Sequence, residues 1–185
     1  MSDKERIRGT TDKDYSIIID KYKDLAFTIA LKITKNEQES EEIVQDSFVK
    51  VFQNLSKFKN DSQFSTWFYR IVYNTSLSAI RKGKISTSEL NSDQNEIIDN
   101  KNYNNVDQIL NRQDRRFIIQ TAMNKLDELD FTILSLYYYE YKSLKEISFI
   151  TGKKRNYLKV LLQRARIKLF DQLNDSVKSE LRELL

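Results

Sequence analysis

A run of basic residues near the C-terminus is the clearest chemical feature of this sequence. A concentrated positive charge of this kind attracts a polyanion, most often nucleic acid. The alternative is a solvated helix face with chance clustering, and charge alone does not separate the two. Between positions 151 and 170 there are seven basic residues and no acidic one: Lys153, Lys154, Arg155, Lys159, Arg164, Arg166 and Lys168.

The residues around this run favour a helix-turn-helix. Ser143 and Glu146 fit a capping box, and Gly152 stands where a tight turn between helices needs a positive φ. In such a motif the second helix, here about 154–170, lies in the DNA major groove, where lysine and arginine read guanine and glutamine reads adenine. A plain antiparallel helical hairpin is the competing interpretation. The face opposite the apolar stripe presents Arg155, Lys159, Val160, Gln163 and Arg164.

An aromatic cluster, FSTWFYRIVYN at 64–74, allows two interpretations. Core packing is expected for Trp67 and Phe68. Aromatic rings can also stack on unpaired bases, and Phe64 and Tyr69 are the candidates for that role. Basic residues flank the cluster: Lys57, Lys59, Arg70, Arg81 and Lys82.

A third segment, ESEEIVQDSFVKVF at 39–52, is acidic at its start and apolar along one helical face. Solvation is the ordinary explanation for charges on the opposite face. A mixed acidic and apolar surface also suits a basic helical partner. The outer face carries Glu42, Gln45, Asp46 and Val49.

The residue types that are missing limit the chemistry. The chain has no histidine and no cysteine, which excludes an imidazole base, a thiolate nucleophile and a Cys/His zinc site. The three glycines are scattered and form no phosphate loop, so we expect neither an enzyme nor a bound metal or cofactor. The apolar stretches are too short to span a bilayer and the N-terminus is polar, so a cytoplasmic protein without membrane insertion is expected.

The elements that position these segments are predicted to be helices, because the chain has no proline and few turn residues. Apolar spacing predicts a helix over 14–35, a second capped by Asn36, and a third ending at Arg81, Lys82 and Gly83. We therefore expect an all-α protein of two small helical domains joined by a flexible linker. The expected domains are 1–83 and 112–185, with the Asn- and Ser-rich linker at 84–111 and a separate short helix at the C-terminus.

Together the three segments resemble an extracytoplasmic-function (ECF) sigma factor of the sigma-70 family. EEIVQDSFVKVF and FSTWFYRIVYNTSLSAIRK are similar to region 2 of that family, and the stretch from LDELDF to RARIKL is similar to region 4. The resemblance implies a transcription initiation factor that directs core RNA polymerase to promoters and helps to nucleate melting. It also implies docking of region 2 on the β′ coiled coil, contact of region 4 with the β flap, and an anti-sigma partner.

The resemblance assigns roles to individual positions. Glu42, Gln45, Asp46 and Val49 are expected to face β′, and Asn74 matches the asparagine associated with −10 recognition. The loop at 57–64, which includes Asn60, is expected to help hold a flipped base. The full −10 set is Lys57, Lys59, Asn60, Phe64, Tyr69, Arg70, Asn74, Arg81 and Lys82. The full −35 set is Lys154, Arg155, Asn156, Lys159, Val160, Gln163 and Arg164.

One departure from the family concerns the recognition helix. Asn156, Tyr157 and Leu158 stand where many members have Gly-Thr-Val, so the −35 preference of relatives does not transfer. Two other functions stay open on the sequence: a stand-alone helix-turn-helix regulator, and a protein-binding helical adaptor without a DNA role.

Overall fold

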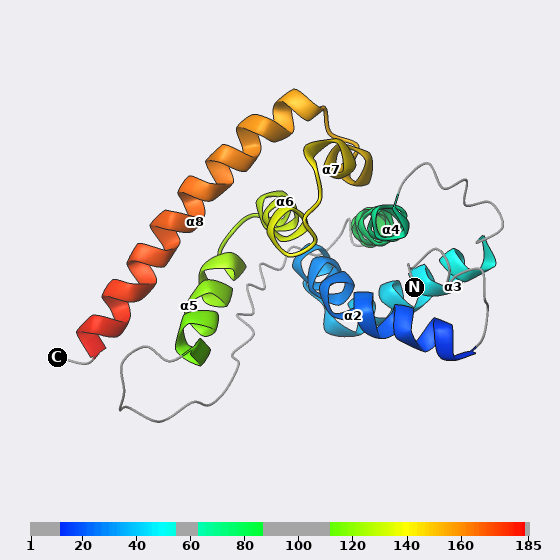
Figure 1. Cartoon of the computed structure of the whole chain (residues 1–185), viewed down its shortest axis with the longest axis horizontal. Coiled ribbons are helices and arrows are strands. Elements are labelled where there is room, and N and C mark those ends of the chain that lie inside the picture. The colour runs from blue at the N-terminus through cyan, green and yellow to red at the C-terminus, as the bar shows by residue number, and fades with distance from the viewer. Residues whose placement is uncertain (1–11, 55–62, 87–111, 184–185) are drawn as a thin grey trace.

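The structure is a computed structural model that describes residues 12–54, 63–86 and 112–183 (Figure 1). Every regular element in these ranges is an α-helix, so the all-α prediction is confirmed. The helices are α2 (Asp12–Thr34), α3 (Glu37–Gln53), α4 (Phe64–Ser86), α5 (Arg112–Asn124), α6 (Glu128–Tyr138), α7 (Leu144–Thr151) and α8 (Arg155–Glu183).

Helices α2, α3 and α4 enclose an aromatic core. Phe68 is fully buried at its centre, stacked on Phe48 at 4.4 Å between ring centroids and in contact with Tyr22. Asn36 caps α3 as predicted, since its side chain accepts a hydrogen bond of 2.9 Å from the Glu39 amide. These three helices form the compact first half of the molecule.

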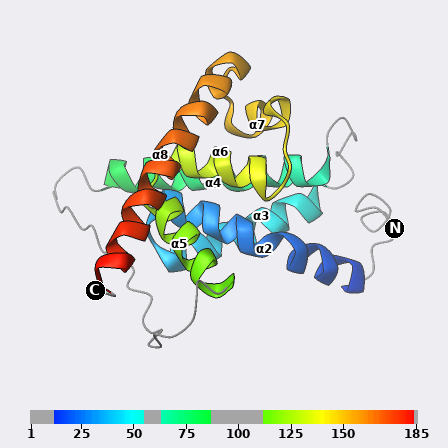
Figure 2. The ribbon, with the colours of Figure 1, turned by 60° about the vertical axis from the view of Figure 1, so that its left-hand side comes forward.

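Helices α5 to α8 form the second half, and α6 lies at its centre, against α7, α8 and α2. Its residues from Asp130 to Leu136 are all buried, because neighbours cover it on several sides (Figures 1 and 2). A helix covered in this way has no wide polar face.

Two predicted helix ends differ from the structure. Helix α4 continues to Ser86 instead of ending at Gly83. One glycine inside a helix destabilises it by only about 1 kcal/mol, so Gly83 does not end the helix. Helix α8 is continuous to Glu183, where we expected a separate C-terminal helix. No glycine or proline interrupts 155–183, so nothing in the chain breaks it there. The rest of the predicted linker, 87–111, lies outside the described residues.

The two halves pack against each other, with α7 on α4 and α6 on α2 (Figure 2). Polar groups supply several of these contacts. Lys32 donates to the Asn124 carbonyl at 2.5 Å, and Lys35 lies 3.6 Å from the Glu128 carboxylate. The recognition and docking surfaces described next therefore belong to one closed arrangement.

Candidate nucleic-acid and polymerase interfaces

The turn between α7 and α8 is built as the sequence predicts. The Glu146 amide donates to the Ser143 hydroxyl at 3.3 Å, and the Ser143 amide donates to the Glu146 carboxylate at 2.9 Å, which completes the capping box. Gly152 has φ +70°, and a Cβ there would meet nothing within 4 Å. Glycine is therefore favoured for its backbone conformation and not for lack of space. The Ser148 hydroxyl donates to the Lys153 carbonyl at 2.7 Å and ties the turn to α7.

Helix α8 buries one face and exposes the other. Leu158, Leu162 and Ala165 are buried against α5, α6 and α7. The opposite face is basic and open to solvent over its first two turns, which is the arrangement of a DNA recognition helix. All the residues predicted to read the −35 element are exposed: Lys154, Arg155, Asn156, Lys159, Val160, Gln163 and Arg164.

A lysine with two carboxylates fixes α8 against α6. Lys168 Nζ lies 2.6 Å from Asp127 and 2.6 Å from Asp130, and Asp130 is buried. Hydrogen bonds to the two aspartates raise the pKa of Lys168 well above its usual range, so the ammonium stays charged. Near it, Arg166 Nε donates to the Tyr138 hydroxyl at 2.8 Å. These contacts join α8 to both ends of α6.

Helix α3 presents the predicted docking face. Its inner side chains are buried, among them Ile43, Val44 and Phe48. The outer face is exposed at all four predicted positions: Glu42, Gln45, Asp46 and Val49. Half of the Val49 side chain is open to water, an apolar group beside acidic neighbours. A basic partner helix with an apolar ridge would complement this face.

The residues of the predicted −10 surface that lie on α4 differ in their exposure to solvent. Asn74, Arg81 and Lys82 are exposed, while Arg70 is half-buried with its guanidinium 4.0 Å from the centre of the Phe149 ring. Lys57, Lys59 and Asn60 lie outside the described residues.

The base-stacking interpretation of Phe64 and Tyr69 needs correction. Phe64 is a core residue, in contact with the rings of Tyr22, Trp67 and Phe68. Tyr69 is also buried, and its hydroxyl donates to Glu140 at 2.8 Å. Burial and the Glu140 charge raise the pKa of Tyr69 well above its usual range. Neither ring offers a face to an unpaired base in this arrangement.

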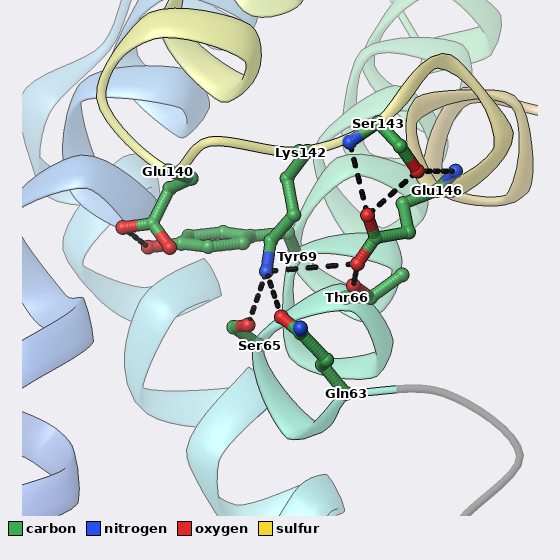
Figure 3. A network of polar contacts seen from close by, with 8 residues as sticks. All are labelled: Gln63, Ser65, Thr66, Tyr69, Glu140, Lys142, Ser143 and Glu146. Atoms are coloured by element: carbon green, nitrogen blue, oxygen red, sulfur yellow. Dashed lines mark hydrogen bonds and ion pairs between the residues drawn. The ribbon is translucent and has the colours of Figure 1, made fainter.

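Several contacts between the two halves were not predicted from the sequence. Lys142, Glu140 and Glu146 reach from the second half of the molecule to the N-terminal turns of α4 (Figure 3). Sequence analysis placed Glu146 in the capping box and gave Glu140 and Lys142 no role. A pattern within one segment does not reveal a partner about 70 to 80 residues away.

Neither a metal site nor a membrane span is found in the described ranges. No group of three or more aspartates and glutamates there is arranged to hold a metal ion. No helix among the described residues is both long and apolar enough to cross a bilayer.

Comparisons with known proteins agree with this arrangement. Residues 18–85 match the family Sigma-70 region 2, and residues 116–169 match Sigma-70, region 4. The ECF sigma factor SigW of Bacillus subtilis is 34% identical over 87 residues, which is 45% of this chain and 46% of that protein. The sigma factor YlaC of the same organism is 26% identical over 148 residues, 80% of this chain and 84% of YlaC.

Two solved structures share the fold. The first is the sigma factor RpoE in complex with the anti-sigma factor NepR from Bartonella quintana, with a TM-score of 0.66 and 21% identity over 88% of this chain and 98% of that one. The second is CnrH in complex with the cytosolic domain of CnrY, with a TM-score of 0.59 and 18% identity over 94% and 96%.

The chain therefore belongs to the sigma-70 family, as an ECF RNA polymerase sigma factor that directs transcription initiation. A factor of this class is not an enzyme. The polymerase carries out the chemistry, so the functional surfaces of this chain are binding surfaces. The first half of the molecule is region 2 and the second half is region 4.

Proposed function

We propose that region 4 of this sigma factor reads the −35 element with α8. The observation that carries this proposal is the exposed basic face of α8 directly after the Gly152 turn. Lys159 and Gln163 lie four residues apart on that face, where one groove can contact both side chains. The remaining cations would bind phosphates and supply affinity without sequence preference.

Region 2 has two tasks in this proposal. The outer face of α3, around Asp46 and Val49, docks on the β′ coiled coil of core polymerase. Asn74 and the nearby cations Arg70, Arg81 and Lys82 hold the −10 element. Region 4 also contacts the β flap. The proposed domain limits are 1–83 for region 2, 84–111 for the linker and 112–185 for region 4.

Tethering makes the two weak DNA contacts effective together. Each domain binds a short promoter element. Once one domain is bound, the linker raises the local concentration of the second domain at the second element. Spacing between the promoter elements is then set by the distance at which the polymerase holds the domains.

An anti-sigma factor is a further proposed partner. RpoE and CnrH, which share the fold, were each solved with a partner, NepR and the cytosolic domain of CnrY respectively. The cytoplasmic location is also proposed, because the partners of a sigma factor, core polymerase and promoter DNA, are in the bacterial cytoplasm.

Binding to core polymerase tests this function against the stand-alone regulator. The full chain should bind core enzyme, and Asp46→Lys should weaken binding roughly tenfold by placing a positive charge opposite a basic partner. Asp24→Lys, the same charge reversal at an exposed position on α2, is the matched control and should bind as the parent protein does. A chain that binds duplex DNA but not core polymerase would favour the regulator instead.

A further inference from the structure

Val160 is an apolar side chain at the centre of the recognition face of α8. With 3.6 residues per turn, it lies about 160° around the helix from both Leu158 and Leu162, which are buried. In the part of the chain that the structure describes, its neighbour Leu161 packs against the core and Val160 does not. The Val160 side chain is 49% exposed. Packing within the chain therefore does not account for a valine at this position.

Polar side chains that can bind DNA stand on both sides of Val160. Lys159 and Gln163 lie to one side of it around the helix, and Arg164 lies to the other, and all three are exposed. Single exposed apolar residues are common on protein surfaces. Val160 differs from these because it lies between groups suited to bases, in the N-terminal half of the helix, which is the part that reaches base edges. The base-facing surface of α8 thus includes one apolar group.

Thymine is the base that complements such a group. It alone among the four bases presents a methyl group in the major groove, on its C5 atom. A valine side chain neither donates nor accepts a hydrogen bond, so against a purely polar base edge it would displace water without replacing its hydrogen bonds. Against thymine, the γ-methyl groups of Val160 would instead bury the C5 methyl group.

The Val160 side chain is also pre-organised for this contact. A β-branched residue in a helix has one strongly preferred χ1 rotamer, so its methyl groups are already oriented. The backbone that carries it is anchored by the buried Leu158 and Leu162. Little rotamer entropy is therefore lost when Val160 meets a base, in contrast to the long side chains of Lys159 and Gln163.

We infer that Val160 is a specificity-determining residue of the −35 contact and selects a thymine through its C5 methyl group. This inference rests on the proposed function and deepens it, because it assigns a base type to one residue. The thymine can stand on either strand, since both present base edges in the major groove. Val160 and Gln163 are three residues apart, about 5–6 Å between Cβ atoms, and base pairs are stacked about 3.4 Å apart. The thymine is thus expected within about two base pairs of the base that Gln163 reads.

Selection of promoter sequences by the holoenzyme supplies the probe for this contact. Core polymerase with the full-length protein is offered duplex DNA from upstream of its own gene, in which the −35 element has been randomised. The retained sequences are expected to share at least one position at which thymine is required.

Replacement of each required thymine in turn by deoxyuridine then tests the methyl contact. This change removes only the C5 methyl group and keeps the hydrogen bonds of the base pair. At one position the parent holoenzyme should bind the deoxyuridine promoter roughly fourfold more weakly, which is the effect of one buried methyl group. Val160→Ala should bind the two promoters equally, because the methyl group has lost its partner. Val160→Thr keeps one γ-methyl group and should retain a difference of roughly twofold.

Ile167→Ala is the matched control for Val160→Ala. Ile167 is 56% exposed and lies about two turns further along α8 on the same side of the helix, beyond the part that enters the groove. The variant loses an aliphatic group from the same face and should keep the roughly fourfold difference. Val160 and Ile167 are both exposed, so circular dichroism should show unchanged helix content in all three variants.

The possible results separate the inference from the proposed function. A −35 element in which no thymine is required, or equal binding of thymine and deoxyuridine promoters at every position, would overturn the inference and leave α8 as the reader. A methyl effect that persists in Val160→Ala, or that is lost in Ile167→Ala, would overturn it as well. Failure to form a holoenzyme, or to retain any −35 sequence, would instead overturn the proposed function, and the inference with it.

Discussion

Removing Asp130 should destabilise region 4 far more than removing its neighbour Asp127. Both carboxylates lie 2.6 Å from Lys168 Nζ, but the Asp130 side chain is 3% exposed and the Asp127 side chain 73%. A hydrogen bond to a charged group contributes about 1.5–3 kcal/mol when buried, whereas an exposed ion pair contributes about 1 kcal/mol or less. Asp130 also stands in the first turn of α6, where the helix dipole favours a negative charge.

The two alanine variants make this comparison directly. We expect Asp130→Ala to cost about 2 kcal/mol, which lowers the melting temperature of a domain of this size by roughly 10 °C. Asp127→Ala should cost less than about 1 kcal/mol, because Asp127 makes no side-chain capping bond and its pair with Lys168 is in water.

Thermal unfolding followed by two probes is the assay. Far-UV circular dichroism reports all helices, and the fluorescence of Trp67, the sole tryptophan, reports region 2. Asp130→Ala should shift the circular dichroism transition more than the fluorescence transition. Equal losses in the two aspartate variants, or no loss in Asp130→Ala, would refute the reasoning that burial decides the strength of this contact.

Three further predictions follow from the described residues. Gly152→Ala should cost about 1 kcal/mol by urea unfolding, since the backbone has φ +70° and space is available; an unchanged midpoint would contradict this. Lys159→Ala with Arg164→Ala should weaken binding to a −35 duplex at least about thirtyfold and flatten its salt dependence; equal affinity would exclude α8 as the reader. Burial raises the pKa of Glu146, but hydrogen bonds from Ser143 and Thr66 together with Lys142 outweigh it and hold that pKa below its usual value. Its stabilisation is therefore complete above about pH 4.3 and is lost as the pH falls through the lower folded pKa, so the urea midpoint of unfolding should fall on acidification; an unchanged midpoint would contradict this.

Local features of the sequence were sufficient to predict much of the fold. The capping box of Ser143, the left-handed Gly152 and the Asn36 cap each depend on side chains within a few residues, and all were predicted. The exposed face of α8 was predicted for the same reason, because apolar residues at helical spacing define the opposite face.

Other features depend on the folded arrangement and were beyond sequence reasoning. Phe64 and Tyr69 belong to an aromatic segment with rings on several helical faces, so spacing could not separate core from surface. The burial of Lys142 depends on Gln63 and Ser65, which are 79 and 77 residues away in the chain. The predicted end of α4 was wrong, because Gly83 and its basic neighbours are only a local stop signal and the helix continues through them.

The central claim is that this chain gives core RNA polymerase its promoter choice. The most direct measurement is run-off transcription with core polymerase, with and without the purified protein, on DNA from upstream of its own gene. We predict a discrete start site that appears only with the protein and depends on two elements, one near −10 and one near −35. Absence of any protein-dependent start site, together with failure to bind core polymerase while duplex DNA is still bound, would contradict the account.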